Sequence, residues 1–395
     1  MSRPRIYLND LGIVCALGGG KAEVATRLLA GDASGMVLTD AYSLGKMLTL
    51  GMVRSALPAL PTATPAHQSR NNRLLFAAYE EIRTTVEALR ARIPSGRLGV
   101  VIGTSTSGIA ESEQAIQHLQ RCGCLPAGFH YGQQELGNPA QFLADVLALD
   151  GPAYSVSTAC SAGAKALASA ARLVRMGACD AVLAGGADAL CRFTVAGFSA
   201  LEAVSDARSN PCSANRRGIN IGEGAALFIV GREPAEITLL GVGESSDGYH
   251  ISAPDPGGKG VLLAMRVALQ EAGLRAEDID YLNLHGTATP QNDAMEARVV
   301  HGLFGGELPV SSTKPLTGHT LGAAGAIEAG LCWLLLSAYN PHRILPPHCW
   351  DGVEDPALPR LHLVRPGERA RRLNHVLSNS FAFGGSNAVV LLGRG

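Results

Sequence analysis

The amino-acid sequence predicts an α/β protein made of two similar halves. Short apolar runs alternate with segments of helical periodicity, and this alternation favours mainly parallel, buried sheets. Three short motifs also return in the same order in the second part of the chain, as an internal duplication would leave them. The 395 residues are 47% hydrophobic, which is enough apolar material for a substantial core.

The first half contains the clearest series of predicted elements. Its expected strands are residues 5–8, 98–102, 154–158, 181–184 and 225–230. Its expected helices are residues 21–29, 162–176 and a segment whose apolar face is marked by Leu75, Tyr79, Ile82, Val86 and Leu89. Residues 55–72 carry three prolines and are predicted to form a loop, and residues 205–221 a polar excursion.

The second half repeats this order. Strands are expected at residues 237–240, 281–284 and 310–313, and helices at 261–272 and around 319–338. The recurring pairs are residues 103–106 with 286–289, 157–158 with 312–313, and 222–232 with 384–394. We therefore expect two units, residues 1–233 and 234–395, with a site between them at strand ends that open helices.

Composition argues against several classes of protein. The formal net charge of −1 gives no electrostatic case for a nucleic-acid partner. We expect neither a secretory leader nor a membrane span, and nine irregularly spaced cysteines suggest a reducing, cytoplasmic environment. Cys122 and Cys124 form a close pair without further ligands nearby, so we expect a loop there and no metal site in the chain.

Cys160 is the first candidate catalytic residue. It stands between a predicted strand and a predicted helix, with small residues on both sides. Unpaired N–H groups and the dipole at a helix N-terminus favour the thiolate, which is the reactive form. A buried structural cysteine is the alternative, because a free thiol packs as a small hydrophobic group. From the position of Cys160 alone, the catalytic and the structural interpretation are about equally supported.

His285 and His319 are further candidates, at corresponding turns of the second half. Both lie beside glycine and threonine residues, whose loops let a ligand approach the backbone. Lys314 precedes a proline and is expected in a turn, where Glu328 is a candidate partner. Taken singly, each of these four side chains has an ordinary structural or surface explanation.

Two other charged groups have structural explanations. Asp293 and Glu296 have the spacing of a capping box, and we assign them that role. A basic cluster near the C-terminus is expected to be a solvated surface run; it comprises Arg365, Arg369, Arg371 and Arg372.

Together, the motifs resemble those of β-ketoacyl-acyl-carrier-protein synthases of the Cys-His-His type, within the thiolase-like superfamily. The matching stretches are STACSAGAKAL around Cys160, HGTATPQND from His285, STKPLTGHTLGAAGAIEA with Lys314 and His319, and NSFAFGGSNAVVLL. Their joint specificity is high, because they are ordered and spread over residues 158–392. The resemblance implies a thiolase-like fold whose two duplicated βαβ halves pack in α-β-α-β-α layers.

The resemblance also implies the chemistry of each matching residue. Cys160 would carry an acyl chain as a thioester. His285 and His319 would assist decarboxylation of a malonyl-carrier protein and stabilise the enolate, which would attack that thioester. Lys314 and Glu328 would organise the two histidines. No cofactor is implied beyond the phosphopantetheine arm that the acyl carrier protein itself carries.

Further roles follow from the same resemblance. The backbone N–H groups of Cys160 and Phe381 would form an oxyanion hole, which stabilises the charge of a tetrahedral intermediate. Phe381 would also gate access to the site. The implied substrate-binding residues are Thr287, Thr289, Phe383 and Thr106.

Departures from the family pattern suggest a specialised enzyme of the aryl-polyene or polyketide branch as much as one of primary fatty-acid synthesis. Cys212, Arg217 and Ile219 replace an expected Phe, Asp and Phe. The partners implied are an acyl carrier protein and a second subunit, in a homodimer or in a heterodimer with a chain-length-factor-like protein. The alternatives are a non-catalytic chain-length-factor-like subunit, which the presence of Cys160 disfavours, and a thiolase, which His319 disfavours.

Overall fold

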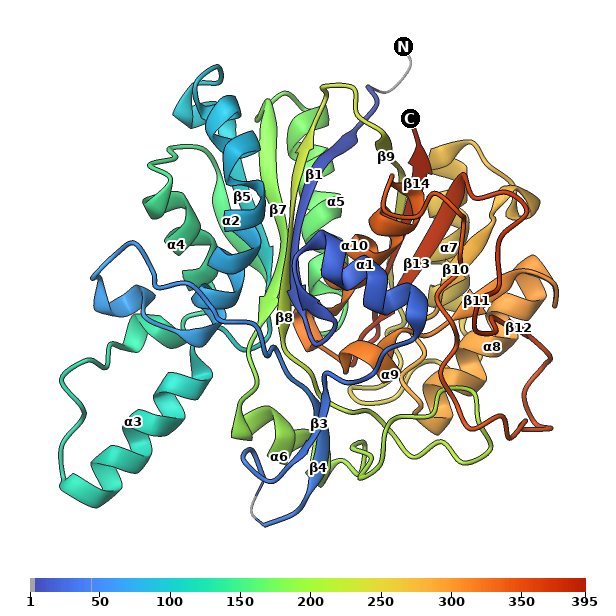
Figure 1. Cartoon of the computed structure of the whole chain (residues 1–395), viewed down its shortest axis with the longest axis horizontal. Coiled ribbons are helices and arrows are strands. Elements are labelled where there is room, and N and C mark those ends of the chain that lie inside the picture. The colour runs from blue at the N-terminus through green and yellow to red at the C-terminus, as the bar shows by residue number, and fades with distance from the viewer. Residues whose placement is uncertain (1–3, 44) are drawn as a thin grey trace.

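The same strand order occurs twice in the structure, once in each half of the chain (Figure 1). The computed structural model describes residues 4–43 and 45–395. The N-terminal order is β1 (Tyr7–Cys15), β8 (Gly224–Gly231), β7 (Ala181–Asp188), β5 (Leu98–Gly103) and β6 (Ala153–Val156). The C-terminal order is β9 (Ile237–Ser246), β14 (Ser386–Arg394), β13 (His375–Phe381), β10 (Tyr281–Asn283), β11 (Pro309–Ser311) and β12 (His362–Leu363).

Strand directions match as well. In each half the first two junctions are antiparallel and the next two are parallel. The halves meet where Tyr7 of β1 pairs with Thr238 of β9. The predicted α/β fold with a duplicated strand order is confirmed, although its sheets are mixed rather than wholly parallel.

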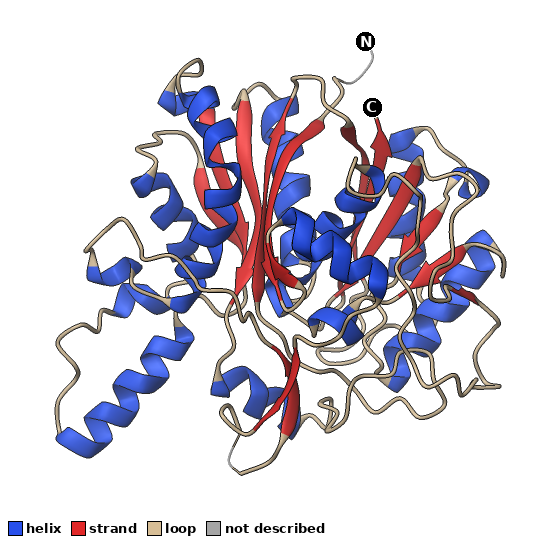
Figure 2. Cartoon of the chain, in the orientation of Figure 1, coloured by secondary structure: helices blue, strands red, loops and turns tan. Residues whose placement is uncertain are grey.

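Helices cover the sheets in layers (Figure 2). The outer face of the N-terminal sheet carries α2 (Arg70–Arg90) and α4 (Asn138–Val146), and the C-terminal half carries α7 (Lys259–Ala272) and α8 (Pro290–Phe304). Between the halves, α5 (Ala162–Arg175) packs against α10 (Ala324–Leu336). The remaining helices are α1 (Lys21–Ala30), α3 (Ile109–Cys122), α6 (Arg192–Ala200) and the single turn α9 (Lys314–Thr317). The α-β-α-β-α arrangement is thereby confirmed.

The central helix α10 is buried along its whole length of 13 residues. Its sequence AGAIEAGLCWLLL has no polar face, as expected for a helix enclosed on all sides. Its backbone approaches α5 so closely that a Cβ atom added to Gly163 would lie 2.6 Å from the amide nitrogen of Ala326. Small residues at this crossing therefore let the two halves meet.

Three local predictions are corrected. The proline-rich segment ends earlier than expected, because α2 begins at Arg70 and Ser69 caps it by accepting a hydrogen bond from the Asn72 backbone N–H at 3.1 Å. Cys122 is the last residue of α3 rather than part of a loop. The helix expected around residues 319–338 begins at Ala324, so His319 lies in the turn before it.

Several strands were not predicted, among them β12 and β13 of the C-terminal half. β3 (Met36–Thr39) and β4 (Leu48–Gly51) form a separate antiparallel pair. A further short strand, β2 (Gly18–Gly19), pairs with β1. Across residues 4–43 and 45–395, no helix combines the length and the apolar character that crossing a membrane requires.

The α5–α10 crossing yields a stability prediction. Gly163→Ala should destabilise the fold by about 1–3 kcal/mol, because the added methyl group collides with the backbone of α10. Gly197→Ala is the matched control, since that glycine is also helical and no described residue outside its own helix backbone lies within 4 Å of an added Cβ atom. The control should be neutral or slightly stabilising. Urea unfolding of both variants tests this, and equal stability of the two would contradict it.

Candidate active site

Cys160 lies in the tight turn between β6 and α5 and is 3% exposed. Three turns of the site each contain a non-glycine residue in the left-handed region: Ala159 (φ 49°), Ala288 (φ 62°) and Leu321 (φ 50°). Such backbone costs about 1–3 kcal/mol per residue and persists only where the surrounding structure enforces it. These three are among eight described non-glycine residues with positive φ, and they lie in the turns of Cys160, His285 and His319, which indicates turns shaped for a function.

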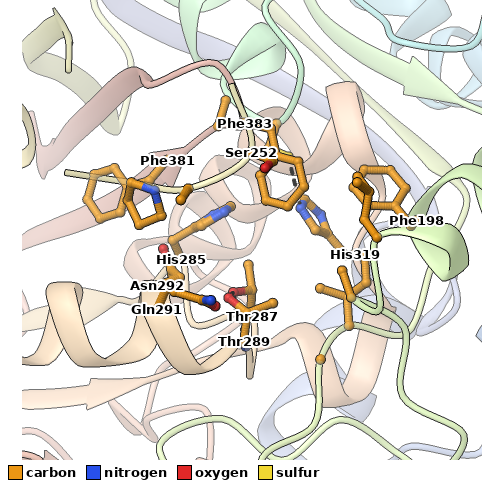
Figure 3. Close-up of a pocket in the computed structure, with 18 of the residues that line it drawn as sticks. Phe198, Ser252, His285, Thr287, Thr289, Gln291, Asn292, His319, Phe381 and Phe383 are labelled. Atoms are coloured by element: carbon orange, nitrogen blue, oxygen red, sulfur yellow. Dashed lines mark hydrogen bonds between the residues drawn. The ribbon is translucent and has the colours of Figure 1, made fainter. Parts of the chain in front are cut away.

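Both predicted histidines lie close to the cysteine. Figure 3 shows the two histidine rings in the cavity. The Nε2 atom of His319 lies 3.0 Å from the Sγ atom of Cys160. The rings of His285 and His319 are perpendicular, with centroids 5.4 Å apart. The Cys160 sulfur and one nitrogen of each ring lie within 4.8 Å of one another, and this donor set is also of a kind that binds zinc.

Lys314 and Glu328 stand behind the histidines as a buried ion pair. Nζ of Lys314 donates to Oε1 of Glu328 at 2.5 Å and to Nδ1 of His285 at 3.4 Å. Lys314 and Glu328 are each only 2% exposed. An ammonium group has no acceptor, so Nδ1 of His285 is the acceptor and the proton of the neutral ring sits on Nε2. The predicted pairing of Lys314 with Glu328 is confirmed.

Burial decides the protonation of the site. Desolvation raises the pKa of the Cys160 thiol to about 11, although the Lys314 charge and the backbone N–H groups of Phe383 and Cys160 act in the opposite direction. Desolvation, with the nearby Lys314 charge, also holds the pKa of both His285 and His319 well below the ordinary value. The backbone N–H groups thus act toward the thiolate as expected, but desolvation outweighs them, and burial favours a neutral thiol beside neutral imidazoles.

Desolvation likewise raises the pKa of Glu328 to about 7, against the lowering effect of Lys314.

Asp293 and Glu296 do not form the predicted capping box. The side chain of Glu296 accepts hydrogen bonds from the backbone N–H groups of His285 and Gly286, both at 2.8 Å. That of Asp293 accepts from the backbone N–H groups of Ala288 and Cys212, at 3.2 and 2.8 Å. These buried carboxylates hold the turn that carries His285. Their spacing also fits a cap, so the sequence alone gave no signal of this use.

Phe381 and Phe383 stand differently to the predicted oxyanion hole. Besides the N–H of Cys160 itself, the backbone N–H that lowers the pKa of the Cys160 thiol belongs to Phe383. Phe381 is instead the last residue of β13, and its ring packs against that of His285 with centroids 5.8 Å apart. The Phe383 ring is partly exposed and meets Phe198 at 5.6 Å. Both phenylalanines line the same cavity as Cys160.

This cavity of about 320 Å³ leads from Cys160 to the surface. Thr287 and Thr289 line it, and their hydroxyl groups are 2.9 Å apart. Sequence reasoning missed several lining residues, among them Phe198, Ser252, Gln291 and Asn292 (Figure 3). Gln291 and Asn292 directly follow the HGTATP motif, which could have indicated them, whereas nothing near Phe198 or Ser252 did.

Thr106 does not line this cavity. Its hydroxyl group donates to Oδ1 of the buried Asp188 at 2.8 Å, and its backbone N–H donates to the same oxygen. The other oxygen of Asp188 accepts from the backbone N–H of Gly322 at 2.6 Å. Asp188 thus connects the turn after β5 with the segment that follows His319.

Comparison with known proteins places this geometry in a family. The model of the β-ketoacyl synthase N-terminal domain matches residues 58–235, and that of the C-terminal domain matches residues 237–349. The chain is 31% identical over 432 residues to 3-oxoacyl-[acyl-carrier-protein] synthase 2 of Coxiella burnetii, covering 100% of this chain and 99% of that protein. It is also 31% identical to nodulation protein E of Rhizobium meliloti, covering 98% of each.

Solved structures agree. A chain of the complex between the ketosynthase ApeO and its chain length factor ApeC from Xenorhabdus doucetiae superposes with a TM-score of 0.94 and 45% identity, covering 99% of this chain and 98% of that one. A β-ketoacyl synthase from Burkholderia phymatum superposes with a TM-score of 0.87 and 28% identity, covering 99% and 100%. With its family motifs, its fold and its Cys-His-His site in agreement, the chain belongs to the β-ketoacyl synthase family.

Proposed function

We propose that this chain is the catalytic subunit of a β-ketoacyl-acyl-carrier-protein synthase. The contact between Sγ of Cys160 and Nε2 of His319, with His285 beside them, carries this proposal. A subunit that only shaped a partner's tunnel would need neither the nucleophile nor this contact. The function is an acyl transfer followed by a decarboxylative Claisen condensation.

In the first half-reaction, Cys160 attacks the thioester carbonyl of an acyl-carrier protein. The thiol proton moves to His319, whose low pKa leaves Nε2 free to accept it. The backbone N–H groups of Cys160 and Phe383 stabilise the oxyanion. Release of the carrier thiol leaves the acyl chain on Cys160.

In the second half-reaction, a malonyl-carrier protein loses carbon dioxide. The Nε2 proton of His285, directed into the cavity by Lys314, stabilises the enolate oxygen, and His319 assists. The enolate carbon attacks the Cys160 thioester and the bond between the carbonyl carbon and Sγ breaks, which gives a β-ketoacyl chain two carbons longer. The expelled thiolate takes up a proton from solvent through His319 and becomes the thiol again. Thr287 and Thr289 hydrogen-bond the phosphopantetheine arm, and Phe383, next to Gly384 and Gly385, is the gate between the two substrates.

The remaining assignments belong to the same proposal. The division into units 1–233 and 234–395 falls in the connection between β8 and β9. No cofactor is needed beyond the arm of the carrier protein. All nine cysteines are unpaired, which supports a cytoplasmic location. Thr106 lies in the turn after β5 that Asp188 holds, and we place the acyl chain beside this turn, outside the cavity described above.

A specialised pathway and a heterodimer are favoured over primary fatty-acid synthesis and a homodimer. The similarity at 45% identity to a chain of a ketosynthase–chain length factor complex supports this choice. The second subunit is then a chain-length-factor-like protein, and an acyl carrier protein delivers both substrates.

Intact-mass measurement tests the reaction. After incubation with a panel of acyl-carrier proteins, the wild type should gain the mass of one acyl group, and addition of malonyl-carrier protein should yield a chain two carbons longer. Cys160→Ala should gain no acyl mass, because it lacks the attacking sulfur. If folded wild type, alone and mixed with its partner subunit, accepts no acyl group, the non-catalytic interpretation becomes the better one.

The pH dependence follows from the lowered histidine pKa values. A lowered pKa keeps an imidazole neutral to a lower pH, so the condensation rate should not fall as the pH passes down through the ordinary value of 6.5. The acid limb of kcat/KM should lie below that value. Because the pKa of Glu328 is raised to about 7, a limb centred at 6.5 or above contradicts the neutral pair only if Glu328→Gln leaves that limb in place.

Lys314 is a positioning residue in this mechanism. Lys314→Met combined with Glu328→Gln avoids an unpaired buried charge and should lower malonyl decarboxylation about 100-fold. Because the positive charge near both histidines is gone, the acid limb should also move toward higher pH. Lys259→Met, on the exposed start of α7, is the control. A slower enzyme with an unmoved limb would assign Lys314 a purely structural role.

A further inference from the structure

Arg217 occupies an unusual position at the cavity. Among the described residues that line the cavity, it is the only lysine or arginine. Its side chain is exposed, whereas Cys160 at the other end of the cavity is buried. Within residues 4–43 and 45–395, no hydrogen bond or ion pair occupies its guanidinium group. The charge is therefore free to meet a ligand at the mouth.

The backbone around Arg217 is held firmly. Arg216 turns inward and donates to Oδ2 of Asp355 at 2.6 Å and to the carbonyl oxygen of Ser213 at 2.8 Å. On the other side, the Gly218 N–H donates to the carbonyl oxygen of Ala288 at 2.8 Å. Ala288 lies between the two cavity threonines, so Arg217 is presented next to the turn that they form. A fixed backbone lowers the entropic cost of ordering the side chain on a ligand.

Acidic neighbours do not cancel this charge. Asp247 also lines the cavity, but Oδ1 accepts a hydrogen bond from Nδ2 of Asn387 at 2.7 Å, and Oδ2 accepts from the Asp255 backbone N–H at 3.1 Å. Glu202 lines the cavity too and is exposed, yet forms no ion pair with Arg217. Glu202 therefore leaves the Arg217 guanidinium available to a ligand.

The substrate of the proposed function carries its charge where Arg217 stands. Phosphopantetheine bears the thioester at one end and a phosphodiester at the other, where it joins the carrier protein. When the thioester reaches Cys160 at the base of the cavity, the phosphate remains near the exposed mouth. A guanidinium group matches phosphate geometry with two parallel hydrogen bonds.

We propose that Arg217 binds the phosphate of the phosphopantetheine arm and selects phosphorylated acyl donors; this rests on the proposed function. The resemblance implies an aspartate at this position, so the sign of the charge is reversed in this chain.

Small acyl donors show whether Arg217 responds to the phosphate of the arm or to a carboxylate of the carrier protein. We would compare acyl-phosphopantetheine with acyl-pantetheine, which lacks the phosphate, by the initial rate at which each acylates Cys160. Wild type should prefer the phosphorylated donor about tenfold, as expected for one charge-assisted hydrogen-bonded contact. Arg217→Gln should bring the rate ratio close to one, and Arg217→Lys should keep part of the preference. Arg266→Gln, an exposed arginine of α7 outside the cavity, should keep the full ratio.

Three other outcomes would each overturn either the role of Arg217 or the proposed function. An unchanged ratio in Arg217→Gln overturns the proposal. A wild-type ratio of one, with a loss in Arg217→Gln only for the intact acyl-carrier protein, would show that Arg217 contacts a carboxylate of the carrier and would also overturn it. If wild type is acylated by none of the three donors, the proposed function itself fails, which a loss confined to the phosphate preference would not imply.

Discussion

The close approach of α5 and α10 is the contact on which the site depends. Gly163 lies against the backbone of Ala326, so the helices that begin after the cysteine turn and after the His319 turn share one interface. Cys160 comes from the first half of the chain, while His319 comes from the second. A larger side chain at the crossing would push these halves apart, and a hydrogen bond at 3.0 Å tolerates little displacement.

Burial sets the chemistry that this contact assembles. In water a cysteine and a histidine have pKa values close enough to exchange a proton readily. Here desolvation moves the two pKa values apart, so the neutral pair is the resting state. Negative charge then develops on the substrate oxygen during the reaction. The Lys314 ammonium and the backbone N–H groups are already in place near that position. Fixed dipoles of this kind are more effective inside a protein than in water, because they need no reorganisation.

The two ends of the cavity have different chemistry. At the base, buried carboxylates do structural work: Glu296 holds the His285 turn by its backbone, and Glu328 balances Lys314. At the mouth, Arg217 is exposed and has no hydrogen-bond or ion-pair partner among the residues that the structure describes. The base suits the proposed condensation, and the mouth carries the charge to which we assign phosphate binding.

Much of this protein could be predicted from its sequence. Strand–turn–helix patterns and ordered motifs identified the duplicated α/β fold, Cys160, both histidines and the Lys314–Glu328 pair, because each lies within a local pattern of a few residues. Tertiary structure decided what local patterns cannot contain. It brought the backbone N–H of Phe383 to the thiol, since this depends on how the loop after β13 lies against the Cys160 turn of the other half. It directed the Glu296 carboxyl group to the backbone of the His285 turn instead of a helix cap, because hydrogen-bond partners distant in sequence meet only when the chain is packed. It also raised the pKa of the Cys160 thiol, because only packing excludes water from the site.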